Sequence, residues 1–178
     1  MDNDIERIEL AKFRFNSAAM AGLIIGAAVS LLVFATDLFK DNQVVVQILS
    51  FAEFIVVCWG LYRYTRQYVI KRQMHLVSFG HILSFQMLIT LFASVLIGLS
   101  TYAVMFLVSP DFYLNMYKEL FTSEIIGHEM SDNFSEVYAQ LGSSPFTMVI
   151  YSVVGTLLKW FFPAMIISVI LKRKKMLK

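Results

Sequence analysis

The chain has 178 residues, of which 58% are hydrophobic and 16% carry a formal charge, and its net charge is +2. A typical soluble domain is about 45–50% apolar and about 25% charged, so this composition excludes an ordinary soluble domain. The small net charge gives no support for nucleic-acid binding, and the single cysteine, Cys58, excludes an internal disulfide framework. The composition indicates a small integral membrane protein, with one membrane domain over residues 1–178.

Four stretches are long and apolar enough to cross a bilayer as helices, for which about 20 residues are needed. In chain order, they are residues 15–36, 43–62, 82–108 and 146–171. The first and third carry no charge, whereas Glu53 is the one charge in the second and Lys159 the one charge in the fourth. Because a backbone in lipid must satisfy its own hydrogen bonds, we expect an all-α integral membrane protein with four transmembrane helices.

Charges outside these spans are sorted by sign, which predicts the orientation of the protein. The connection between the second and third spans contains basic residues and no acid, namely Arg63, Arg66, Lys71 and Arg72. The segment after the fourth span is also basic, whereas residues 111–141 contain six acids against one lysine. Since basic connections remain in the cytoplasm, we expect a multi-pass protein of a bacterial inner (cytoplasmic) membrane, with cytoplasmic N- and C-termini.

The acidic segment between the third and fourth spans is expected to be helical over about residues 110–142. Ser109-Pro110-Asp111 is typical of a helix start, with serine as the N-cap, proline at the first position and an acid in the first turn. Apolar residues then recur at helical spacing, which predicts a short amphipathic segment on the outer side of the membrane. His128 and Glu129 lie in this segment without further residues at ligand spacing, so we predict no metal site.

Two spans contain small or polar residues at every fourth position, which places each set on one helix face. The first set is Ala18, Gly22, Gly26 and Ser30, and the second is Gln86, Thr90, Ser94 and Gly98. Small residues allow close contact between helices, and the Gln86 amide should face other helices because it needs hydrogen-bond partners. For both sets we expect packing inside the bundle, and the alternative is an interface between subunits or a polar path.

Glu53 and Lys159 are the two charges that topology does not explain. A charge near the centre of a bilayer costs about 2.5–3.5 kcal/mol, so we expect both side chains to face protein or a water-filled cavity. Pro163 follows Lys159 by four residues and should kink the fourth span there. Three interpretations remain open: a structural ion pair, a contact with an acid of a partner subunit, and a site for a substrate, a proton or a lipid phosphate.

The chain resembles the bacterial membrane family named domain of unknown function 4199 over about residues 15–175. The resemblance depends on Ser78-Phe79-Gly80 at the third span, on Ser109-Pro110-Asp111-Phe112 after it, on a charged outer helix and on the final Leu171-Lys172-Arg173-Lys174-Lys175. It implies a four-span inner-membrane protein without an assigned activity or a catalytic residue. Members of the family usually have a glutamine or an acid at the position of His81 and no regular counterpart of Lys159. Their genes often lie near family-two glycosyltransferases, which implies a partner enzyme of lipid-linked sugar metabolism.

No nucleophile and base, paired carboxylates or phosphate-binding glycine loop is recognisable in the sequence. We therefore expect a non-catalytic accessory or scaffold subunit without a cofactor, embedded in the lipid bilayer and bound to a protein partner or to a second copy of itself. Its basic residues also suit anionic lipid. The alternative is a small transporter or lipid-handling protein that uses Glu53 and Lys159 together with Gln86 and Pro163.

Overall fold

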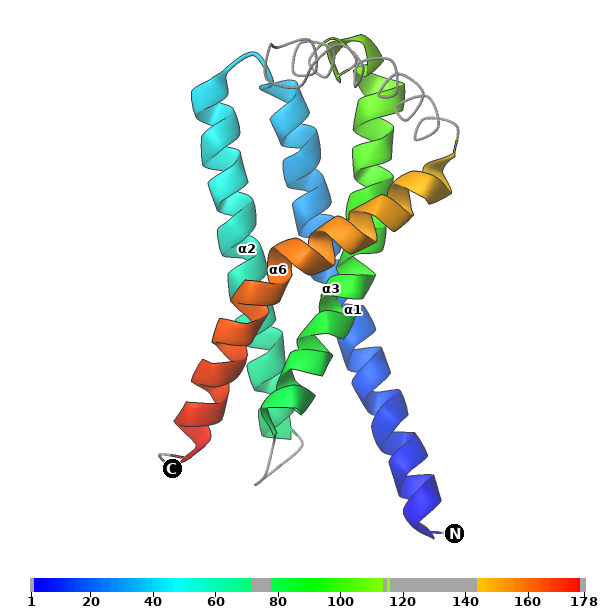
Figure 1. Cartoon of the computed structure of the whole chain (residues 1–178), viewed down its shortest axis with the longest axis vertical. Helices are drawn as coiled ribbons and strands as arrows, with labels where there is room; N and C mark the ends of the chain where they lie inside the picture. Colours follow the sequence, from blue (N-terminus) through cyan, green and yellow to red (C-terminus); the bar gives the residue numbers. More distant parts are fainter. Residues whose placement is uncertain (1, 72–77, 114, 116–143, 177–178) are drawn as a thin grey trace, which may run out of the picture.

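The computed structural model describes residues 2–71, 78–113, 115 and 144–176. Over these residues it contains α1 (Asp2–Leu38), α2 (Gln43–Lys71), α3 (Phe79–Tyr102), the π-helix η1 (Ala103–Val108) and α6 (Pro145–Met176) (Figure 1). The described part has no strand, and it contains four helical stretches long and apolar enough to cross a membrane. The predicted all-α fold with four transmembrane helices is thereby confirmed. Most of the segment predicted over about residues 110–142, including His128 and Glu129, lies outside the described residues.

Two helices are longer than the apolar runs that predict them. Helix α1 begins at Asp2 rather than near Phe15, and α2 continues past Tyr62 to Lys71. Residues 63–71 of the connection predicted to begin at Arg63 are therefore the last part of α2. Hydropathy marks only the residues that suit lipid, whereas glutamate, lysine and arginine are good helix formers and let a helix continue into the polar zone.

Helix α3 is the centre of the bundle, and it packs along α1 on one side and along α6 on the other, whereas α2 makes fewer contacts. Figure 1 shows both chain termini at one end of the bundle and the turn between α1 and α2 at the opposite end. It also shows that α6 crosses the bundle obliquely and changes direction along its length. Pro163 lies inside α6, and its missing N–H leaves the carbonyl of Lys159 without the usual helical donor.

The contact between α1 and α3 depends on two glycines. A Cβ atom on Gly22 would lie 2.5 Å from the Cβ of Phe92, and one on Gly26 would lie 2.9 Å from the carbonyl oxygen of Ala93. The contact between α3 and α6 is equally close, since a Cβ atom on Gly98 would lie 2.9 Å from the Cα of Val149. These glycines therefore serve contacts between helices of the same chain, where only a residue without a side chain allows the backbones to approach.

The two ends of the third span differ in how they are capped. Ser78 is the N-cap of α3, and its hydroxyl accepts a hydrogen bond from the backbone N–H of His81. At the other end the helix widens into η1, which the sequence analysis does not predict, and the N–H of Ser109 donates to the carbonyl of Val104. The chain is helical again from Pro110, as the motif predicts, but the hydroxyl of Ser109 donates to Asp37 instead.

Candidate functional site

Glu53 on α2 and Lys159 on α6 form an ion pair across the bundle. The ammonium of Lys159 donates to the Oε1 atom of Glu53 at 2.7 Å. A charge-assisted hydrogen bond of this length belongs to the strong class. The two charges, 106 residues apart in the sequence, therefore compensate each other within one chain.

The ion pair lies at the surface of the bundle and not in its interior. The side chain of Lys159 is 57% exposed and that of Glu53 is 22% exposed. For Lys159 this differs from the expectation that both side chains face protein or a cavity. The physical reason is the next residue: Trp160 is almost completely buried, and successive helical residues lie about 100° apart around the axis, so Lys159 is directed outward.

Apolar side chains surround the pair along both helices. Phe54 follows Glu53 on α2, and Leu158 and Phe162 flank Lys159 on α6, and all three are exposed. We call this surface the ion-pair face and define it by Glu53, Phe54, Leu158, Lys159 and Phe162. Its three exposed apolar side chains adjoin one cation and one anion.

Trp160 supports the ion-pair face from inside the bundle. Its ring centroid lies 5.7 Å from that of Phe54, and the ammonium of Lys159 lies 5.0 Å from the centroid of the indole ring. A cation over an indole ring gains about 0.5–2 kcal/mol, depending on how far it is desolvated. Lys159 is therefore held in place by Glu53 on one side and by Trp160 on the other.

The buried amide of Gln86 lies apart from the ion pair. Its Oε1 atom accepts a hydrogen bond from the hydroxyl of Ser168 on α6 at 3.4 Å, and both residues are inaccessible to solvent. Within the described residues, the Nε2 atom of Gln86 and the hydroxyl of Thr65 are buried without a hydrogen-bond partner. Gln86 thus links α3 to α6, and its observed hydrogen bond does not extend to Glu53 or Lys159.

Thr90 and Ser94, which share a helix face with Gln86, bond to their own helix. The hydroxyl of Thr90 donates to the carbonyl of Gln86 at 3.0 Å, and that of Ser94 to the carbonyl of Leu91 at 2.7 Å. A serine or threonine satisfied in this way is accommodated in a packed helix contact. Ser30 on α1 is half-buried, and its hydroxyl has no partner among the described residues.

A polar cluster that the sequence analysis missed lies where α1 ends. Asp37 is buried, its Oδ2 atom accepts from the hydroxyl of Ser109 at 3.0 Å, and the ammonium of Lys40 donates to the same hydroxyl at 2.6 Å. Lys40 also lies 3.5 Å from the Oδ1 atom of Asp37. The available signal was that Asp37 and Ser109 directly follow apolar runs, so that the ends of two neighbouring helices meet there.

A second missed contact lies at the end of the bundle with the termini. The hydroxyl of Tyr68 on α2 lies 3.0 Å from the Nε2 atom of His81 on α3, and the Tyr68 ring stacks on that of Phe85 with centroids 3.9 Å apart. Tyr68 is buried, so the hydrogen bond ties α2 to α3.

Over the described residues, no group of three or more His, Cys, Asp or Glu side chains is placed to hold a metal ion.

Comparison with known proteins gives one family. A protein-family model described as "Protein of unknown function (DUF4199)" matches residues 19–173. No curated protein and no solved structure matches the chain. The family match covers most of the chain and confirms the resemblance seen in the sequence motifs, while it assigns no activity.

Proposed function

The chain belongs to the DUF4199 family of proteins of unknown function, and we propose that it serves as a non-catalytic accessory or scaffold subunit of a bacterial inner membrane. In this proposal the ion-pair face binds a transmembrane helix of a partner protein. The observation that carries the proposal is the exposure of Lys159, which is 57% accessible inside an apolar span.

The energetic argument starts from the position of the charge. A lysine near the centre of a bilayer costs about 2.5–3.5 kcal/mol on insertion scales. Glu53 offsets part of this cost through the ion pair, but the outward side of the ammonium still faces the surroundings of the bundle. A partner helix with a carboxylate, hydroxyl or amide at this level satisfies the remaining donors of Lys159, while its apolar residues pack on Phe54 and Phe162.

The resemblance to the family gives the class of partner. We propose a glycosyltransferase of lipid-linked sugar metabolism, since genes of the family often lie near such enzymes. The proposed orientation, with both termini in the cytoplasm, agrees with the basic residues at the ends of α2 and α6. In this arrangement the small subunit supplies a helix surface and the partner supplies the chemistry.

Capture of the partner from native membranes tests this proposal. The full-length chain, tagged and expressed in its own host, is purified in a mild detergent as the wild type, as the Glu53→Gln, Lys159→Met double variant and as Lys172→Met. Lys172 is an exposed lysine at the end of the apolar part of α6, so the last variant removes a charge without touching the ion-pair face.

We expect a larger membrane protein with a glycosyltransferase sequence to co-purify with the wild type and with Lys172→Met. The amount that co-purifies with the double variant should be at least tenfold lower. A wild type recovered only as a free monomer contradicts the proposal. Equal recovery of the partner with the double variant contradicts it as well, and a second copy of the chain as the captured protein replaces the proposed partner by a homo-oligomer.

The alternative of a small transporter or lipid-handling protein built on the same pair has less support. Such a site needs polar groups that converge around the two charges inside the bundle. Lys159 is directed outward, and the hydrogen bond that Gln86 accepts comes from Ser168, so the residues proposed for the pathway are not assembled into one.

A further inference from the structure

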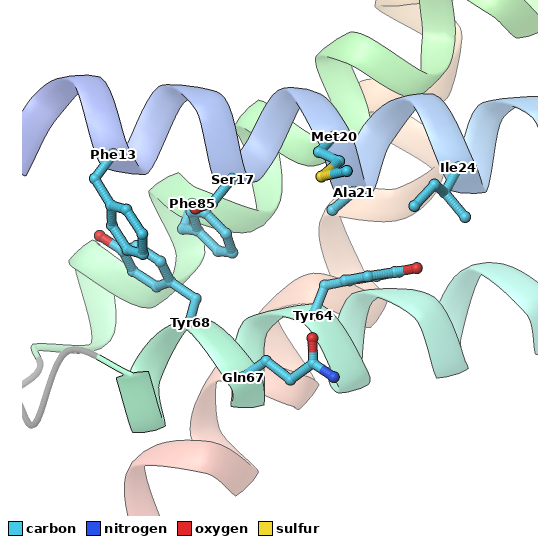
Figure 2. A pocket seen from close by; sticks show the side chains of 9 residues that line it. All are labelled: Phe13, Ser17, Met20, Ala21, Ile24, Tyr64, Gln67, Tyr68 and Phe85. Atoms are coloured by element: carbon cyan, nitrogen blue, oxygen red, sulfur yellow. The ribbon is translucent and has the colours of Figure 1, made fainter.

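Two hollows meet at Gln67 on α2, near the end of the bundle that carries both termini. One hollow, of about 140 Å³, lies between α1 and α2 and continues to Phe85 of α3 (Figure 2). The other, of about 340 Å³, lies on the neighbouring side of α2, between Trp59 and Ile70. Because Gln67 lines both, the two hollows adjoin at this residue.

The hollow between α1 and α2 is a largely apolar groove. Figure 2 shows Met20, Ala21 and Ile24 of α1 facing Tyr64 and Gln67 of α2 across it. Met20 and Ile24 are exposed, so the groove opens towards the surroundings of the bundle. It extends from Phe13 and Tyr68, close to the polar end of the helices, to Ile24, within the apolar span, and this direction suits an acyl chain that enters from the interface.

The neighbouring hollow is basic. Arg63 and Arg66 lie three residues apart on α2, hence on one helix face, and both are exposed. In the described part of the chain neither guanidinium has an acidic partner within ion-pair distance. The Arg63 guanidinium lies 4.9 Å from the centroid of the Trp59 ring, which holds it in place while its N–H groups remain available.

Two arginines without an acidic partner among the described residues match the oxygens of a phosphate, because the planar guanidinium can donate two parallel hydrogen bonds. The side-chain amide of Gln67 adds a further donor between the two hollows. Basic residues that only determine the orientation of a membrane protein need to lie near the membrane surface, and they need no particular neighbours. Here the charge adjoins an apolar groove, and that combination matches an amphiphile with a phosphate headgroup.

We propose that this end of α2 binds one anionic glycerophospholipid, with its phosphate at Arg63 and Arg66 and an acyl chain in the groove between α1 and α2. The site is independent of the proposed partner face, because Arg63 lies about 15 Å further along α2 than Glu53. A lipid held there fills the space between α1 and α2 and fixes the position of α2 against the rest of the bundle.

Native mass spectrometry of the full-length chain in detergent tests the site. The probes are dioleoyl phosphatidylglycerol and, as the zwitterionic counterpart, dioleoyl phosphatidylcholine. The variants are Arg63→Gln with Arg66→Gln, and Lys174→Gln with Lys175→Gln, which removes the same charge from the basic C-terminal segment. Circular dichroism of each variant is the control for helical content.

We expect a phosphatidylglycerol adduct on the wild type and on the lysine variant, and an affinity at least tenfold lower for the arginine variant. Equal losses of affinity for the two variants show non-specific electrostatic attraction, which amounts to about 1 kcal/mol for each basic residue. That result overturns the proposal. Phosphatidylcholine binding as tightly as phosphatidylglycerol also overturns it, because the anionic headgroup is then not recognised.

The groove has its own test, in which the charge is unchanged. Met20→Trp and Ser17→Phe each place a larger side chain in the groove, and Met20 is 70% exposed, so its replacement does not disturb the core. Both variants should weaken phosphatidylglycerol binding at least threefold. Unchanged binding overturns the placement of the acyl chain, and displacement of the lipid by millimolar glycerol phosphate shows a site for soluble phosphates instead.

Discussion

Helices α3 and α2 are both long and apolar enough to cross the membrane, but they differ in how much of their surface is buried inside the protein. The apolar part of the span Phe79–Val108, which contains α3, is 44% buried inside the protein, against 17% for the apolar part of the α2 span, Gln43–Ile70. Helix α3 turns its polar residues inward, as Gln86 and Ser94 show, whereas α2 leaves Trp59, Arg63 and Arg66 exposed. Helix α3 is therefore the packing axis of the protein, and α2 offers the larger share of its surface to lipid or to other molecules.

The difference follows from what can hold helices together in lipid. Apolar side chains gain little from leaving lipid for protein, so helices associate through close packing and hydrogen bonds. Helix α3 has the close packing at Gly22, Gly26 and Gly98. Helix α2 packs mainly on α1, where a Cβ atom on Gly60 would lie 2.8 Å from the side chain of Ile25. Its contacts to α6 and α3 include single polar contacts, namely the ion pair of Glu53 and the hydrogen bond of Tyr68.

The packing axis is most sensitive at Gly22, and Gly22→Leu is expected to have the largest effect. A Cβ atom there already meets Phe92 and the backbone of Ile89, so α1 and α3 must separate. We expect a loss of about 3 kcal/mol, at the upper end of the range for overpacking, measured by unfolding the purified protein in mixed micelles. Gly155→Leu is the matched control, because among the described residues no atom outside the local helix backbone lies within 4 Å of a Cβ at Gly155. Equal losses for the two variants contradict close packing at Gly22.

Among substitutions in α2, we expect a large loss of stability when the ion pair of Glu53 with Lys159 is broken. Glu53→Gln leaves the ammonium of Lys159 without its counter-ion, and we expect a loss of about 2 kcal/mol. This is below the full insertion cost, since the long stem of Lys159 lets its ammonium move towards the polar interface. Adding Lys159→Met should restore most of the stability in the same unfolding assay. A double variant as unstable as Glu53→Gln alone contradicts the pairing of the two residues.

Replacement of the buried Gln86 of α3 should change stability less than its burial suggests. Gln86→Leu removes one long hydrogen bond from Ser168 and also an Nε2 atom that has no partner among the described residues. The lost bond and the relieved burial oppose each other, so stability should change by about 1 kcal/mol or less. Ser168→Ala, which retains the amide and removes its partner, should be the less stable of the two. The reverse order shows that Gln86 makes a further strong contact.

The number and class of the helices are predictable from the sequence, because a run of apolar residues of this length has one stable form in lipid. The faces of α1 and α3 are predictable as well, since glycine spacing marks where backbones approach. The outward direction of Lys159 is not, because it depends on which neighbour, Lys159 or Trp160, occupies the core. The groove beside Gln67 is equally invisible, since it arises from the distance between two helices.

A substitution at Gly155 should separate the stability of the isolated chain from its binding to the proposed partner. It lies one helical turn before Lys159, on the same face of α6, and no neighbouring helix of the described residues lies within 4 Å of a Cβ at this position. Gly155→Leu should therefore change the stability of the isolated chain by only about 0.5 kcal/mol, as for other surface substitutions. The same variant should lose most of the partner in the capture experiment, because a new side chain keeps a partner helix away from the ion-pair face. Undiminished capture would place the partner elsewhere on the bundle, since an interface at Lys159 leaves no room for leucine one turn away.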